Sequence, residues 1–258
     1  MPGTPFEAKA LNEVCLSIED GQFVGIIGHT GSGKSTLISH LNGLEKSEPG
    51  VVLVNGIDLG AKDTDLIAVR RAVGLVFQYP EYQLFEETVA KDVAFGPTNL
   101  GLDEAEIRLR VDWALRQVGL NPEEVAEKSP FELSGGQKRR VAIAGVLAMK
   151  PSILILDEPT SFLDIRYKLE LLSILREMAR DEGVTVIMSL HEIDLAMKIS
   201  DRMICVKGDH IFLEGNPEEV LNEGLIRELY GIDNGFFDPL YGSLELARTA
   251  GAPQVFVI

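Results

Sequence analysis

The sequence contains no apolar run that approaches the roughly 20 residues a helix needs to cross a bilayer. It also lacks the basic-then-apolar N-terminal pattern of a secretory signal peptide. These absences predict a cytoplasmic chain that reaches the cytoplasmic face of a membrane only through partners. Basic residues are scarce, with 24 Lys and Arg against 40 Asp and Glu, so the net charge is −16. Because phosphate backbones repel such a charge, we expect no nucleic-acid partner.

Cysteine is almost absent: Cys15 and Cys205 are the two cysteines of the chain. Each stands in an apolar, strand-like stretch, far from the other and without metal-ligand spacing. They are best interpreted as reduced core residues, with a disulfide as the weaker alternative. Hydrophobic residues make up 45% of the 258 positions and charged residues 25%. This composition is ordinary for a globular protein, and the length suits one large domain or a core with an inserted subdomain.

Short apolar runs alternate with helical patterns along most of the chain. Strands are predicted at residues 24–27, 51–54, 74–77, 153–156, 184–188, 203–206 and 210–213, with helices between several of them. Asn55 and Gly56 predict a hairpin turn after the second of these strands. Residues 86–149 have a helical pattern, which includes a capping box of Asp103 and Glu106. The sequence therefore predicts an α/β fold, with a parallel-sheet nucleotide-binding core at 1–85 and 150–230. A helical subdomain is inserted at 86–149, and an irregular tail follows at 231–258.

A phosphate-binding loop is predicted between the first strand and the first helix. It consists of Gly28, His29, Thr30, Gly31, Ser32, Gly33, Lys34, Ser35 and Thr36, and it fits the pattern G-x-x-x-x-G-K-S. Glycines let backbone N–H groups converge on phosphate oxygens, and the helix N-terminus adds its positive dipole end. We expect Lys34 to neutralise phosphate charge and Ser35 to hold Mg²⁺. The alternative, a glycine turn with a surface lysine, is disfavoured by the strand and helix around it.

Two acidic residues, Asp157 and Glu158, follow the apolar run at 153–156. This run is apolar on both faces, as a central parallel strand should be, so both acids belong at the carboxyl edge of the sheet. We expect Asp157 to hold Mg²⁺ through water and Glu158 to orient and polarise the attacking water. A solvated turn is the alternative, and the phosphate loop upstream disfavours it.

A second anion site is predicted at Leu133, Ser134, Gly135, Gly136 and Gln137, because a Ser-Gly-Gly sequence here enters a helix. The chain thus has two anion sites but one phosphate loop. The order of phosphate loop, pentapeptide and acid pair resembles the ATP-binding cassette (ABC) ATPases over nearly the whole chain. This resemblance implies a RecA-like P-loop NTPase core with an antiparallel β subdomain and a helical signature subdomain. It also implies ATP and Mg²⁺ as cofactors.

The same resemblance implies that the active unit is a dimer with a second ABC subunit, either a copy or a related chain. Ser134 and Gly136 then contact the γ-phosphate of ATP held by that subunit. His191 matches the switch histidine that contacts the γ-phosphate, although a lone histidine after a strand is more often structural. Gln78 matches the glutamine that reaches Mg²⁺, and Asp164 matches the loop that crosses the dimer interface.

Residues 78–85 and 89–97, together with Phe131 and Glu132, resemble the ATPases of energy-coupling-factor (ECF) transporters, which take up vitamins and cobalt or nickel ions. In that family this segment docks helices of a membrane scaffold subunit near residues 78–85. Ordinary packing of its aromatic residues is the alternative. The resemblance implies an ATP-hydrolysing subunit of an ECF-type importer. A soluble ABC ATPase of iron–sulfur assembly, translation or DNA repair is the rival hypothesis.

Two features depart from the ECF pattern. Residues 161–167 differ from the Ala-Gly-Leu-Asp-Pro-like stretch that ECF ATPases usually carry there. After them, residues 189–196, 205–207 and 241–258 resemble importer ATPases of the iron-siderophore and cobalamin type. This raises the hypothesis of a recombinant or designed chimera, with a seam near 156–160 and only basal ATPase activity. Family members also usually begin with a strand whose aromatic residue stacks on adenine, and Phe6 is not in register to replace it. Because such stacking contributes about 1–3 kcal/mol per base, we expect weak nucleotide binding with poor base selectivity.

Overall fold

A six-stranded sheet forms the centre of the computed structural model, which describes residues 11–161, 163–231, 236–238 and 243–245. Its spatial order is β4-β5-β6-β1-β7-β8. The strands are β1 Phe23–Ile27, β4 Val73–Val76, β5 Ile153–Leu156, β6 Thr185–Ser189, β7 Arg202–Lys207 and β8 His210–Gly215. All neighbouring pairs are parallel except β7 and β8, which are antiparallel. The predicted α/β fold with a mostly parallel sheet is confirmed.

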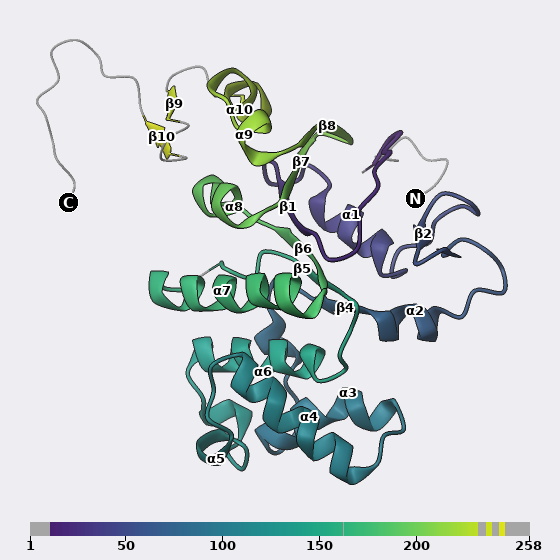
Figure 1. Cartoon of the computed structure of the whole chain (residues 1–258), viewed down its shortest axis with the longest axis vertical. Helices are drawn as coiled ribbons and strands as arrows, with labels where there is room; N and C mark the ends of the chain where they lie inside the picture. The colour runs from purple at the N-terminus through teal and green to yellow at the C-terminus, as the bar shows by residue number, and fades with distance from the viewer. Residues whose placement is uncertain (1–10, 162, 232–235, 239–242, 246–258) are drawn as a thin grey trace, which may run out of the picture.

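Helices cover both faces of the sheet (Figure 1). On one face, Val24 and Ile26 of β1 pack with Leu37 of α1 (Lys34–Leu41), and α2 (Leu66–Ala72) joins the same cluster. On the other face, Phe23 and Ile27 share a cluster with residues of α7 (Ile165–Glu182) and α8 (Ile193–Ile199). Because successive residues of β1 alternate between two buried faces, every residue of the strand is buried.

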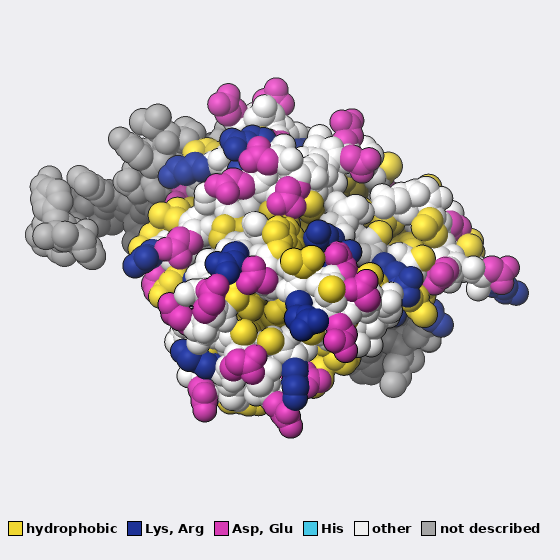
Figure 2. Space-filling model, turned by 60° about the horizontal axis from the view of Figure 1, so that its bottom comes forward, with side chains coloured by type: hydrophobic (Ala, Val, Ile, Leu, Met, Phe, Trp, Pro, Cys, Tyr) yellow, Lys and Arg dark blue, Asp and Glu magenta, His cyan; other side chains and the backbone are white. Residues whose placement is uncertain are grey.

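The segment 86–149 is helical, as predicted, and lies in the lower part of Figure 1. It contains α3 Val89–Asn99, α4 Glu104–Gln117, α5 Pro122–Val125 and α6 Gly135–Leu147, flanked or interrupted by the 3₁₀ turns η1 Pro80–Gln83 and η2 Pro130–Glu132. Asp103 caps α4, since its carboxylate accepts the amides of Ala105 and Glu106 at 3.0 Å each. On the face shown in Figure 2, acidic and basic side chains are interspersed with apolar ones.

Two small antiparallel pairs complete the strands. β2 Leu53–Val54 and β3 Ile57–Asp58 form a hairpin around the Asn-Gly turn that the sequence predicts, with φ of 49° at Asn55 and 76° at Gly56. Near the C-terminus, α9 Pro217–Val220 and α10 Glu223–Tyr230 precede β9 Phe236–Asp238 and β10 Ser243–Glu245, which also pair. The tail predicted as irregular therefore contains two short strands. Its other residues after Gly231 lie outside the described part, as does Phe6.

The prediction that both cysteines are core residues is wrong for Cys15, which is exposed. It lies in a segment whose other side chains, Leu11, Val14, Leu16 and Ile18, pack against the sheet. Cys205 in β7 is buried as predicted, and its burial raises the pKa of the thiol to about 12. Both thiols are free. Within the described ranges, no helix is both long and apolar enough to span a membrane.

Candidate active site

The glycine-rich loop follows β1 and ends where α1 begins, at Lys34. Gly31 and Gly33 have φ of 82° and 95°, in the left-handed region that glycine adopts without strain. A Cβ on Gly28 would lie 2.2 Å from the carbonyl oxygen of Val206, so no side chain fits there. At Gly31 a Cβ would meet nothing within 4 Å. The loop therefore packs against β7 on one side and stays open on the other, as a phosphate cradle requires.

Lys34 is buried, with 4% of the residue exposed. Its ammonium donates to the carbonyl oxygens of Gly28 at 2.8 Å and His29 at 3.1 Å. Burial lowers the pKa of Lys34, and the charges of Glu158 and Asp157 act in the opposite direction. The amine is thus held by carbonyls of the loop itself, in a position from which it can exchange these acceptors for phosphate oxygens.

The other loop residues divide into exposed and buried ones. His29 and Thr30 are exposed, and the His29 ring bonds the Thr30 carbonyl at 2.9 Å. Ser35 is exposed at the start of α1. Ser32 is fully buried, and its hydroxyl has no hydrogen-bond partner within the part of the chain that the structure describes. Thr36 lies in the first turn of α1, where its carbonyl bonds the His40 ring at 2.8 Å.

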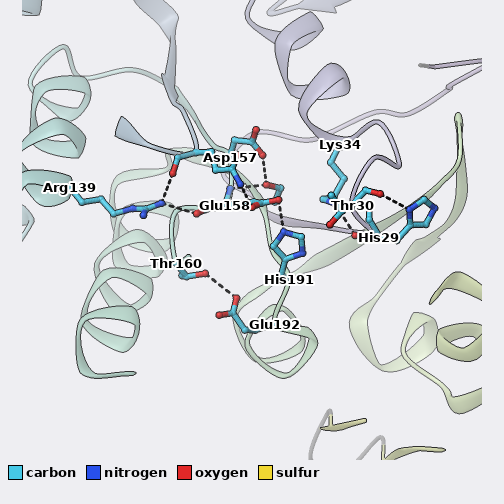
Figure 3. Close-up of polar contacts among 12 residues, drawn as sticks. His29, Thr30, Lys34, Arg139, Asp157, Glu158, Thr160, His191 and Glu192 are labelled. Carbon is cyan, nitrogen blue, oxygen red and sulfur yellow. Dashed lines mark hydrogen bonds and ion pairs between the residues drawn. The ribbon is translucent and has the colours of Figure 1, made fainter. Parts of the chain in front are cut away.

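Asp157 and Glu158 directly follow β5, next to the loop in space (Figure 3). Asp157 is 8% exposed and accepts a hydrogen bond of 2.6 Å from the Ser189 hydroxyl. Glu158 has φ of 48°, a left-handed conformation that is uncommon for a residue with a side chain. Its amide donates to the Ser189 hydroxyl at 2.8 Å, and its carbonyl accepts from Arg139 at 2.8 Å. The backbone of Glu158 is therefore fixed on both sides.

Gln78 and His191 meet the Glu158 carboxylate from the two neighbouring strands. Gln78 follows β4, and its amide nitrogen donates to Oε2 of Glu158 at 2.5 Å. His191 follows β6, and its Nε2 lies 2.5 Å from Oε1 of Glu158. The Glu158 side chain is 12% exposed and that of His191 is 40% exposed. Figure 3 shows the imidazole directed at the carboxylate. The sheet thus brings together three residues that are far apart in the sequence.

The donors near the loop are suited to a hard cation. Ser35, Gln78 and Asp157 offer a hydroxyl, an amide and a carboxylate, whose oxygens Mg²⁺ prefers. Among the described residues, no three His, Cys, Asp or Glu side chains form a metal-binding group. A cation here would therefore depend on these oxygens together with those of a bound phosphate.

The pentapeptide 133–137 lies at the N-terminus of α6. Leu133 is buried, whereas Ser134 and Gly135 are exposed. Ser134 caps the helix by accepting the Gln137 amide at 3.4 Å, and the Gln137 side chain returns to the Ser134 amide at 3.1 Å. Gly136 is half-buried in the first turn. Within the described ranges, no hydrogen bond joins this pentapeptide to the glycine loop of the same chain.

Asp164 is also exposed and caps α7, where it accepts the Tyr167 amide at 3.2 Å. The structure therefore leaves both predicted interface elements, Asp164 and the pentapeptide, on the surface. It places Lys34, Gln78, Asp157, Glu158 and His191 around one point at the end of the sheet.

Sequence reasoning missed several polar residues that support this site. Arg139 and Ser189 hold the Glu158 backbone. Glu192 accepts the Thr160 hydroxyl at 3.1 Å and pairs with Lys168. The sequence does contain a signal for Arg139. This basic residue stands one helical turn before Ile143, on the face of α6 that is otherwise apolar and buried. The others had none, since their contacts join distant segments.

Known proteins resemble this chain over most of its length. The protein family described as "ABC transporter" matches residues 11–161. The energy-coupling factor transporter ATP-binding protein EcfA2 of Clostridium perfringens is 51% identical over 232 residues, covering 90% of this chain and 81% of that protein. The protein of the same name from Caldanaerobacter subterraneus subsp. tengcongensis is 54% identical over 230 residues, 89% of this chain and 80% of that protein.

Solved structures agree with these relatives. CbiO1 from Clostridium perfringens, part of the ABC transporter complex cbiONQ, superposes with a TM-score of 0.75 and 41% identity. The match covers 85% of this chain and 86% of that one. A dimeric ATP-binding cassette in a post-hydrolysis state with ADP and Pi superposes with a TM-score of 0.73 and 33% identity, covering 81% and 90%.

The hypothesis of a chimera has no support from these relatives. A seam near 156–160 would divide the chain into parts with different origins. The EcfA2 proteins instead align over about nine-tenths of the chain, which includes both sides of that point. The resemblance of the second half to siderophore and cobalamin importers is therefore no sign of a separate origin. The fold, the phosphate loop and these relatives agree that the chain belongs to the ABC transporter family and is an ATPase of the ABC type.

Proposed function

We propose that this chain is the ATP-binding and ATP-hydrolysing subunit that energises an ECF-type importer. One observation carries the proposal: the Glu158 carboxylate is held by Gln78 and His191 at the end of the sheet that also bears the glycine loop. This arrangement occurs in a chain that is 51–54% identical to EcfA2 proteins.

Nucleotide binding is assigned to the loop of residues 28–36. Its amides and the α1 N-terminus receive the phosphates, and Lys34 neutralises their charge. Ser35, Gln78 and Asp157 would hold Mg²⁺, which would supply positive charge against the terminal phosphates. Lys34 must then exchange the carbonyls of Gly28 and His29 for phosphate oxygens.

Hydrolysis is assigned to Glu158 and His191. Glu158 orients the attacking water and polarises it, and His191 contacts the γ-phosphate. In the structure both side chains are engaged with each other. Gln78 also bonds Glu158, so an arriving water and γ-phosphate must replace these contacts. Catalysis therefore requires a rearrangement of side chains at the ends of β4, β5 and β6.

The exposed pentapeptide and Asp164 are assigned to a second cassette, either a copy of this chain or a related one. Ser134 and Gly136 lie at a helix N-terminus, which favours an anion, yet they are separate from the loop of their own chain. A head-to-tail dimer places them against ATP on the other subunit. A single chain is then half of the active unit, and Asp164 lies where the subunits meet.

The site for a membrane scaffold is assigned to an apolar groove beside residues 78–85, between α2 and the helical subdomain (86–149). The groove has a volume of about 460 Å³, and its lining includes Leu84, Phe85, Phe95 and Met149. Phe85 and Phe95 make an edge-to-face contact with ring centroids 5.0 Å apart, and both are exposed, as are Tyr79 and Tyr82. Exposed aromatic side chains around an apolar groove suit a helix end of the scaffold subunit. Docking there would make the chain peripheral to the membrane.

Mg-ATP hydrolysis, measured together with dimerisation, tests the proposal. The variant Glu158→Gln should retain ATP binding, accumulate an ATP-bound dimer and lose nearly all turnover. A matched control is Glu123→Gln, because Glu123 pairs with Arg116 on the surface of the helical subdomain. The control should hydrolyse ATP at the wild-type rate.

Two outcomes count against the proposal. Unchanged hydrolysis in Glu158→Gln would show that another group activates the water. If a co-expressed ECF scaffold neither stimulates the basal hydrolysis nor recruits the chain to membranes, that result would favour a soluble ABC ATPase.

A further inference from the structure

Arg139 is a buried cation whose recorded hydrogen bonds all end on backbone carbonyls. It lies in α6, five positions after Ser134, and is 3% exposed. Its Nη2 donates to the carbonyls of Gln78 and Glu158, each at 2.8 Å. Its Nη1 donates to the carbonyl of Ser161 at 2.7 Å. In the described part of the chain, no carboxylate lies within ion-pair distance of it.

Such an arrangement is costly for a side chain that only fills space. Burial lowers the pKa of Arg139, which means that the protein destabilises its charged form. An apolar side chain would fill the same position in α6 without that cost. The guanidinium is useful for its fixed fork of donors, which can hold several carbonyls in one geometry.

The three carbonyls belong to the segments that form the hydrolysis site. Glu158 has a left-handed φ of 48°, so its backbone needs support from its surroundings. The Ser189 hydroxyl accepts a hydrogen bond from the Glu158 amide, and Arg139 donates one to the Glu158 carbonyl. Gln78, whose side chain bonds the Glu158 carboxylate, is held by the same nitrogen of Arg139. Arg139 therefore fixes both ends of the contact between Gln78 and Glu158.

We propose that Arg139 is a positioning residue for ATP hydrolysis, which sets the orientation of Glu158 and links α6 to it. The helix that carries the pentapeptide at its N-terminus also carries, little more than one turn later, the group that holds the hydrolysis site. A shift of α6 then moves the carbonyls of Gln78, Glu158 and Ser161 together. This inference rests on the proposed role of Glu158 as the residue that polarises water.

Arg140 offers a matched control on the same helix. It donates to the carbonyls of Val118 and Gly119, at 3.4 and 3.3 Å, inside the helical subdomain. It also lies over the Tyr167 ring at 4.8 Å. Arg140 thus holds backbone carbonyls as Arg139 does, but none of them belongs to Gln78 or Glu158.

The test compares Arg139→Lys with Arg140→Lys in the wild type and in Glu158→Gln. The rate is measured by single-turnover hydrolysis of γ-labelled ATP. It is divided by the concentration of ATP-binding sites, so that unfolded protein does not lower it. Arg139→Lys should lower the rate about 10- to 100-fold, because misplacement of a catalytic group costs this much, while the KM for ATP in steady-state assays changes little. In Glu158→Gln the same substitution should have almost no further effect. Arg140→Lys should leave the rate within about twofold in both backgrounds.

Three results would overturn the proposal: an unchanged rate, a loss confined to KM, or an equal loss in the wild type and Glu158→Gln. Arg139→Gln provides a second variant if the lysine variant folds poorly, and the same comparison applies to it. The proposed function fails separately, since it predicts that Glu158→Gln alone abolishes turnover.

Discussion

The Nε2 atom of His191 lies 2.5 Å from the Oε1 atom of Glu158, and this contact joins the end of β6 to the end of β5. The two residues are 33 positions apart in the sequence. Gln78 bonds the other carboxylate oxygen from the end of β4. The groups proposed to activate water and to contact the γ-phosphate are therefore engaged with each other in the structure.

His191→Ala should lower the rate of ATP hydrolysis about 100-fold and change ATP affinity much less, because the imidazole acts on the reacting groups. Steady-state kinetics with Mg-ATP and a direct binding measurement check this. His210→Ala is the control, since His210 is exposed and contacts Asp209. An equal loss in both variants would contradict a specific role of His191.

Lys34→Met should weaken ATP binding at least about 100-fold without lowering the stability of the nucleotide-free protein. Burial lowers the pKa of Lys34, so the folded state binds this proton less tightly than the unfolded state. This costs stability below the ordinary pKa of 10.5, where the unfolded side chain is protonated. Methionine removes that cost and fills similar space. Chemical denaturation at pH 7, with and without ATP, measures both effects. ATP should stabilise the wild type alone, and a large loss of stability without ATP would contradict the interpretation.

Phe85→Ser should bring the ATPase rate measured with an ECF scaffold subunit close to the rate without it. Phe85 lines the apolar groove and is 57% exposed, so its removal takes contact area from the docking surface. Leu109→Ser is the matched control, because Leu109 is 67% exposed on α4 and does not line the groove. Stimulation that survives in Phe85→Ser would place the docking surface elsewhere.

Asp201→Asn should destabilise the fold at neutral pH by about 0.5–1 kcal/mol, a modest figure because solvent screens a half-exposed pair. The hydrogen bonds from Arg176 lower the pKa of Asp201 below its ordinary 3.8, helped by the Phe23 amide. A carboxylate whose pKa is lowered by folding stabilises the folded state above pH 3.8. This stabilisation is lost as the pH falls through the pKa of the folded state.

Denaturant unfolding at pH 7 and at pH 3 measures the difference between Asp201→Asn and the wild type. It should be present at pH 7 and smaller at pH 3. Asp181→Asn is the control, since the Asp181 pair with Arg180 is on the surface of α7 and contributes little. A difference that is independent of pH would show that the charge of Asp201 is not its cause.

Local sequence patterns predicted much of the fold. The glycine loop, the run 153–156 and the Asn-Gly hairpin turn depend on backbone sterics and burial within a few residues, and all appear where they were predicted. Strand limits shifted by one residue, as in β6, or by two, as in β2 and β8, because hydrogen bonding to neighbours decides where a strand ends. Cys15 was placed wrongly because its exposure depends on which side of the segment faces the sheet.

The amino-acid sequence by itself determined the chemistry available to this protein: a loop that receives phosphates, two acids after a buried strand, and a second helix N-terminus for an anion. Only the tertiary structure decided which of these meet. Parallel strands end at one edge of the sheet, so β4, β5 and β6 bring Gln78, Glu158 and His191 to a single carboxylate. The same folding buries Arg139 beneath them, because α6 packs on the carbonyls of segments that are distant along the chain.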